Sequence, residues 1–146
     1  MNKVQAIPEG YRTLTPFLNI AGASEAIDFY KKAFAAEERV RMPGPNGSVV
    51  HAELKIGDSM LMVSDAMRNP PTTSSIHIYV TDADAWWKRA TGAGAKIEMP
   101  IADMFWGDRY GVVSDKWGNR WGISQHKEDV PPEEMRQRAA DAMKNM

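Results

Sequence analysis

The order of secondary-structure signals repeats along this chain of 146 residues, and the repetition limits the folds open to it. In each half, one segment of alternating apolar and polar residues is followed by a segment with helical spacing and then by three more alternating segments. Alternation with a period of two predicts a half-buried strand, whereas apolar residues three or four apart predict a helix with one buried face. The sequence therefore predicts two successive βαβββ modules and an α+β fold.

The first module is expected over about residues 11–66, after an irregular N-terminal arm. Its predicted strands cover residues 12–20, 37–41, 49–56 and 59–64, and its helix covers residues 25–34. Pro16 lies inside the first strand, which favours an edge position or a local break. We expect Ser24 to cap the helix, because its hydroxyl can accept an unpaired backbone N–H. Asn46-Gly47 is the strongest two-residue hairpin signal and is expected to form a turn.

A linker and a second module follow. Residues 67–74 contain two prolines and lack apolar periodicity, which indicates a linker. The second module is expected over about residues 75–128, with strands at 75–80, 95–99, 110–114 and 120–125. Asp82 is the expected cap of its helix, which carries Trp86 and Trp87.

A terminal helix is expected over residues 131–145, because prolines and acidic residues suit the first turn of a helix. Its apolar stripe consists of Met135, Ala139, Ala142 and Met143. The stripe either packs on the body of the protein or binds a partner.

Composition excludes several classes of protein. The absence of cysteine excludes a disulfide scaffold, a cysteine-ligated zinc site and a thiol nucleophile. A net charge of −1 argues against a nucleic-acid binder, which needs a basic patch. No apolar run approaches the ~20 residues that cross a membrane, and the first ten residues do not resemble a signal peptide. We therefore expect one cytoplasmic domain over residues 1–146.

Strand parity separates the side chains into two sets. In the strand at 49–56, the expected apolar set is Val50, Ala52, Leu54 and Ile56. The helices are expected to cover the apolar sets, so the mixed sets line the opposite face of a curved sheet. If the two sheets face each other, they form a ligand cleft. Its predicted lining is Thr15, Phe17, His51, Glu53, Ser75 and His77, with Trp106 and Arg109 closing one end.

Several of these side chains have more than one possible role. Glu53 is either a catalytic base, with its pKa raised by burial, or a structural group. Arg109, next to Asp108, either binds an anionic substrate or forms an internal salt bridge. His51 and His77 are polar cleft residues or, together with Glu53, ligands of a divalent metal. We expect His126 to be an exposed polar residue.

Motifs in both halves resemble those of the vicinal oxygen chelate superfamily, which includes glyoxalases, bleomycin-resistance proteins and dioxygenases. The resemblance covers about residues 11–128 and is strongest to the PhnB-like branch. The motifs that carry it are Ser24–Tyr30, Ala33-Phe34, His51–Leu54, Gly57–Ser59, Tyr79–Ala85, Trp106–Gly111 and Asp115–Trp121. The last motif usually reads Asp-Pro-Phe-Gly-His-x-Trp, and Lys116, Trp117 and Asn119 depart from it while Trp121 is kept.

This resemblance implies a glyoxalase-like fold, and in the glyoxalase type it implies one divalent metal. Family ligands come from the first, third, fifth and last strands and are typically two His and two Glu. The matching positions are Thr15, Glu53, Ser75 and Gly122, of which only Glu53 is a strong ligand. A standard metal site, and with it standard glyoxalase or dioxygenase activity, is therefore not expected.

Three functions remain open. The first is a small-molecule-binding protein without a metal cofactor, as the antibiotic-resistance members are. The second is a metal-dependent lyase, isomerase or dioxygenase with a non-standard site of His51, Glu53 and His77. The third is a partner-binding or regulatory domain. The resemblance also implies a homodimer, and the sequence names neither the ligand nor the pathway.

Overall fold

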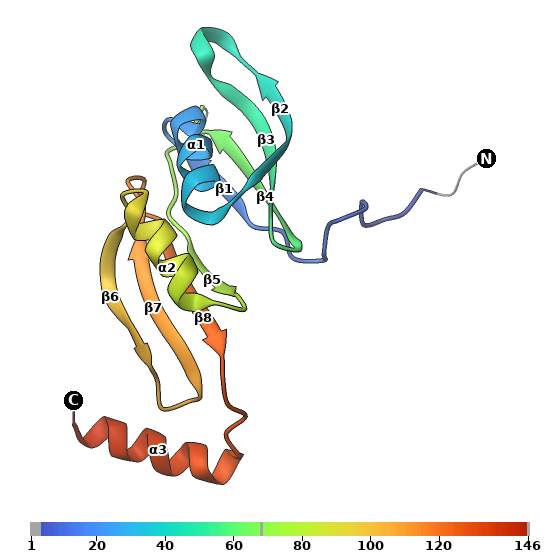
Figure 1. The fold of residues 1–146 in the computed structure, drawn as a ribbon. Coiled ribbons are helices and arrows are strands. Elements are labelled where there is room, and N and C mark those ends of the chain that lie inside the picture. Colours follow the sequence, from blue (N-terminus) through green and yellow to red (C-terminus); the bar gives the residue numbers. More distant parts are fainter. Residues whose placement is uncertain (1–3, 68, 146) are drawn as a thin grey trace. The chain divides into compact units, whose positions relative to one another are not determined.

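The computed structural model describes residues 4–67 and 69–145, which form two compact units divided between Ser74 and Ser75. The first three residues of the predicted arm and residue 68 of the predicted linker lie outside the described residues. Each unit has one four-stranded mixed sheet, and three α-helices are distributed between the two units. The predicted α+β class and the βαβββ order of each half are confirmed (Figure 1). The expectation that both modules share one cleft within a single domain stays a prediction.

Unit 1 contains the first sheet. Its elements are β1 (Phe17–Ile20), α1 (Ala23–Phe34), β2 (Glu37–Pro43), the short 3-10 helix η1 (Pro45–Gly47), β3 (Val49–Ile56) and β4 (Ser59–Asp65). The strand order is β1-β4-β3-β2, in which β1 runs parallel to β4 and the other pairs are antiparallel. At the predicted turn, Asn46 and Gly47 both have positive φ, as a tight hairpin turn requires.

Unit 2 repeats this topology and adds the terminal helix. Its elements are β5 (Ser75–Tyr79), α2 (Ala83–Gly92), β6 (Lys96–Asp103), β7 (Asp108–Ser114), β8 (Arg120–His126) and α3 (Pro132–Lys144). The strand order is β5-β8-β7-β6, with β5 parallel to β8. Among the described residues, no helix is long and apolar enough to cross a membrane.

The two largest differences from the predicted strand boundaries occur in β1 and β6, and in both cases proline explains the difference. Strand β1 begins at Phe17 instead of Arg12, because Pro16 has no N–H for the ladder. Strand β6 continues to Asp103 instead of ending at Met99. It tolerates Pro100 because it is an edge strand and its register shifts near this residue.

The cap of α1 also differs from the prediction. Ser24 lies inside the helix, and Gly22 occupies the N-cap position with φ 94°. The carboxylate of Asp65, at the end of β4, accepts hydrogen bonds from the backbone N–H groups of Gly22 (3.0 Å) and Ala23 (2.9 Å). A distant side chain thus replaces the local cap. The prediction for α2 is confirmed, since Asp82 accepts a hydrogen bond from the N–H of Ala85 at 3.1 Å.

Each helix of a βαβββ module packs on one face of its own sheet. The largest fully buried side chains include Tyr30 and Phe34 of α1, Leu54 of β3 and Trp121 of β8. The expectation that Val50 joins this apolar set is wrong, because Val50 is 41% exposed whereas Val49 is 1% exposed. The β2–β3 register shifts between Met42 and Pro43, and this shift changes the parity at the start of β3.

Candidate functional site

Four ring-bearing side chains gather on the sheet of unit 2. His77 and Tyr79 come from β5, Tyr110 from β7, and Trp106 from the connection between β6 and β7. The ring of His77 stacks on Tyr110 with centroids 5.1 Å apart, and it lies 4.7 Å from Tyr79. Trp106 meets Tyr110 edge to face at 5.7 Å. We call these four residues the aromatic row.

A glycine lets the aromatic row lie close to the sheet. Gly122 of β8 is the strand partner of His77. A Cβ atom at Gly122 would lie 3.0 Å from Cε1 of Tyr110 and 3.1 Å from Nδ1 of His77. The two rings therefore occupy the space that a side chain at this position would need.

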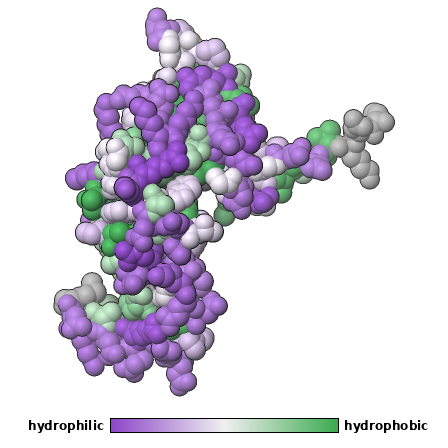
Figure 2. Space-filling view, in the orientation of Figure 1, coloured by the Kyte–Doolittle hydropathy of each residue, from purple (hydrophilic) through white to green (hydrophobic). Residues whose placement is uncertain are grey.

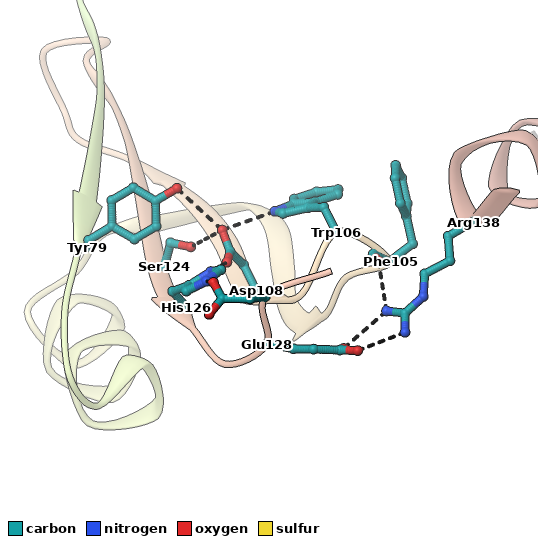
Figure 3. A network of polar contacts seen from close by, with 9 residues as sticks. Tyr79, Phe105, Trp106, Asp108, Ser124, His126, Glu128 and Arg138 are labelled. Carbon is teal, nitrogen blue, oxygen red and sulfur yellow. Dashed lines mark hydrogen bonds and ion pairs between the residues drawn. The ribbon is translucent and has the colours of Figure 1, made fainter. Parts of the chain in front are cut away.

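Asp108 organises the polar edge of the row (Figure 3). Its side chain is only 4% exposed. Oδ2 accepts hydrogen bonds from Trp106 Nε1 (3.1 Å), Ser124 Oγ (3.2 Å) and the Tyr79 hydroxyl (3.4 Å). Oδ1 lies 2.8 Å from Nδ1 of His126. A single buried carboxylate thus binds groups from β5, β8 and the β6–β7 connection.

These contacts shift the pKa values of Asp108, His126 and Tyr79. Burial raises the pKa of Asp108, but hydrogen bonds with His126, Ser124 and Trp106 lower it more, so the net direction is downward. The pKa of His126 is raised by its hydrogen bonds to Asp129 (2.7 Å) and Asp108. Burial and the negative charge of Asp108 raise the pKa of Tyr79. Asp108 is therefore ionised at neutral pH.

The ring of His126 is 52% exposed, as expected, yet it bridges two carboxylates. The sequence does not reveal this role, because Asp108 lies 18 residues away. The spacing of His126 and Asp129 is the one local signal. A surface cavity of about 430 Å³ adjoins this histidine and is lined by Tyr79, Val80, Thr81, Gln125 and His126.

Arg109 points away from the row. As the neighbour of Asp108 on β7, it has the opposite parity. Its guanidinium forms ion pairs with Asp84 of α2 (2.9 Å) and with Asp103 (3.1 Å). The structure thus places Arg109 in salt bridges on the helix side, apart from Trp106.

Unit 1 has a smaller polar group around Glu53. One oxygen of this carboxylate accepts a hydrogen bond from the Tyr11 hydroxyl. The other lies 3.1 Å from Nε2 of His51, whose ring centroid is 6.1 Å from that of Phe17. Three predicted lining residues therefore lie together. Tyr11 was missed because it belongs to the irregular segment before β1.

Of the four positions matched to family metal ligands, Thr15 and Glu53 lie in unit 1, and Ser75 and Gly122 lie in unit 2. Both oxygens of Glu53 have protein partners. The hydroxyl of Thr15 donates to the carbonyl of Arg12, Ser75 is exposed at the start of β5, and rings fill the space beside Gly122. Within the described part of the chain, no group of three or more His, Asp or Glu side chains is arranged to hold a metal ion. The non-standard site of His51, Glu53 and His77 draws on both units and stays a prediction.

Comparison with known proteins agrees with the topology. Residues 15–123 match the model of the Glyoxalase/Bleomycin resistance protein/Dioxygenase superfamily. The uncharacterized protein Rv0887c of Mycobacterium tuberculosis is 40% identical over 136 residues, which covers 84% of this chain and 79% of the relative.

Solved structures share the fold. TioX from Micromonospora sp. ML1 has a TM-score of 0.70 and 27% identity, covering 79% of this chain and 98% of TioX. TnmS3, an antibiotic binding protein from Streptomyces sp. CB03234, has a TM-score of 0.65 and 21% identity, covering 85% of this chain and all of TnmS3. A PhnB protein from Bacillus cereus has a TM-score of 0.58 at 19% identity, covering 78% of this chain and 99% of the PhnB protein.

Proposed function

Since this chain belongs to the glyoxalase/bleomycin resistance protein/dioxygenase superfamily, we propose that it binds a small organic molecule without a metal cofactor. The aromatic row of unit 2 carries this proposal. Stacked and edge-to-face rings offer a rigid apolar surface at low cost in side-chain entropy, and their edges carry polar groups that fix a ligand's orientation. The antibiotic binding of TnmS3 gives an example of this function on the same fold.

Within this proposal, His77, Tyr110 and Trp106 contact the ligand. Tyr79, which is 65% exposed, forms the outer border of the site.

In unit 1, Phe17 and His51 are proposed as a further contact surface. Glu53 is proposed to act as a base if the bound molecule is also transformed. The contacts of Glu53 with Tyr11 and His51 supply the proton partners that such a base needs.

The test is a titration with bleomycin, a glycopeptide that carries a planar bithiazole, and with a planar anthraquinone, in buffer that contains EDTA. Calorimetry should detect saturable binding despite the chelator. Tyr110→Ala should weaken it by about three- to tenfold, as the loss of one aromatic contact predicts. Ile97→Ala is the control, because Ile97 is an exposed apolar residue on another strand of the same unit.

Two results would contradict the proposal. If no compound binds, the small-molecule function is wrong. If binding occurs and a Trp106→Ala/Tyr110→Ala double variant retains full affinity, the assignment of the site is wrong.

A further inference from the structure

Two rings of the aromatic row donate hydrogen bonds to the same buried carboxylate oxygen. The indole N–H of Trp106 and the hydroxyl of Tyr79 both point at Oδ2 of Asp108, as Figure 3 shows. Trp106 lies two residues before Asp108, whereas Tyr79 lies 29 residues away, so only the register of the sheet brings Tyr79 to this oxygen. Plain stacking of a neutral ligand requires neither bond.

Such bonds change the electrostatics of the rings. The face of an aromatic ring is negative because of its quadrupole. A carboxylate that accepts the N–H of an indole or the O–H of a phenol draws the proton toward itself and leaves more electron density on the ring. The faces of Trp106 and Tyr79 therefore attract positive charge more strongly than those of unbonded rings.

The charged residues around the aromatic row also favour a positively charged ligand. Asp108, His126 and Asp129 form one hydrogen-bonded group, whose net charge is −1 when His126 is protonated and −2 when it is neutral. Two nearby arginines are already engaged. Arg109 pairs with Asp84 and Asp103, and Arg138 pairs with Glu128 and Glu134.

The arrangement also indicates what kind of cation fits. Asp108 is 4% exposed and both of its oxygens already have protein partners, so its carboxylate is not accessible to a ligand N–H. Tyr79 is 65% exposed, and the cavity of about 430 Å³ begins beside its ring. A cation that needs a ring face and no hydrogen bond suits this site, and a quaternary ammonium group has these properties.

We propose that the aromatic row binds organic cations of the quaternary ammonium type, with the charged nitrogen over the ring of Tyr79, which lines the cavity. This rests on the proposed small-molecule function and names the class of ligand. Asp108 acts as a positioning residue, which orients the rings of Tyr79 and Trp106 and enriches them in electron density without touching the ligand.

The experiment compares choline with its neutral isostere 3,3-dimethylbutan-1-ol in the full chain. Binding is followed by NMR through the indole N–H resonance of Trp106. Choline should bind at least about threefold more tightly than the isostere, as expected for a cation–π contact. Asp108→Asn should remove this preference, and Ile97→Ala should leave it unchanged.

Since Asp108→Asn removes a buried charge, Tyr79→Phe provides a milder variant. It keeps the ring, loses the hydroxyl bond and should reduce the preference for choline. Equal affinity for the two probes, or an undiminished preference in Tyr79→Phe, would overturn the inference. If the aromatic compounds bind but the protein does not prefer choline over its isostere, only the proposed cation specificity is wrong. If neither the aromatic compounds nor choline binds, the proposed small-molecule function is wrong as well.

Discussion

At the scale of single residues, two carboxylates organise the two units. Asp65 receives three backbone N–H groups, those of Gly22, Ala23 and Val49. Asp108 accepts hydrogen bonds from Trp106 and Tyr79 of the aromatic row. The sequence singles out neither residue for these roles. The partners of Asp65 lie 16 to 43 residues away, and Tyr79 and Ser124 lie 29 and 16 residues from Asp108. An acid beside a strand is indistinguishable, by pattern alone, from an ordinary turn residue.

Asp65→Ala should destabilise unit 1 by about 1–3 kcal/mol, because three backbone donors lose their acceptor. Urea denaturation measures this change. Asp28→Ala on the exposed side of α1 is the control, with an expected effect of about 0.5 kcal/mol or less. An equal loss of stability in both variants would contradict the capping role.

The effect of Asp65 should depend on pH. Burial raises the pKa of its carboxyl, but bonds from Ala23, Val49 and Gly22 outweigh burial, so the folded pKa lies below the ordinary 3.8. The contribution of ionised Asp65 to stability is fully present above pH 3.8 and is lost as pH falls through the folded pKa. The stability difference between the wild type and Asp65→Ala should therefore shrink in acid.

His126 should show the opposite dependence. Hydrogen bonds to Asp129 and Asp108 raise its pKa above the ordinary 6.5. Its contribution is fully present below 6.5 and is lost as pH rises through the folded pKa. We expect the melting temperature of the wild type, relative to that of His126→Gln, to fall as pH rises above 6.5. A pH-independent difference would exclude the titration of this histidine as the cause.

At the scale of elements, the terminal helix α3 is anchored by one arginine. Arg138 donates to the carbonyl of Phe105 at 3.1 Å and pairs with Glu128 at 2.8 Å. The predicted apolar stripe is only half-buried at Met135, Ala139 and Ala142, and Met143 is 68% exposed. Hydrophilic residues cover most of the visible face of this helix (Figure 2). That α3 binds a partner stays a prediction.

Arg138→Met should loosen α3 and the connection before β7, because the segment loses its bonds to Glu128 and to the Phe105 carbonyl. Hydrogen exchange should accelerate over residues 104–107 and 132–144. Arg136→Met, at an exposed position of the same helix, is the matched control. Unchanged exchange in Arg138→Met would show that other contacts hold the helix.

At the scale of the whole molecule, the order of elements could be read from the sequence. The alternation of apolar and polar residues within each strand identifies its buried and exposed faces. The site could be read only in part. Parity assigns His77 to the mixed face, but its stacking on Tyr110 depends on the register that pairs Tyr110 with Ser124 and Val112 with Gly122. Register joins segments that are distant in sequence, and no local pattern records it.

Family membership also leads us to predict a homodimer. Sedimentation equilibrium should give about 33 kDa, twice the 16.3 kDa of one chain. A mass of 16.3 kDa at every concentration would contradict this prediction.

The rings packed over Gly122 have a consequence for how related sequences vary. A Cβ atom at this position would lie 3.0 Å from Tyr110 and 3.1 Å from His77, so a larger residue requires those rings to shift or to be replaced. Substitutions at positions 77, 110 and 122 should therefore be correlated among homologues. We expect lineages that keep the stacked rings to keep the glycine, and lineages that acquire a metal-binding side chain at 122 to have changed the stack.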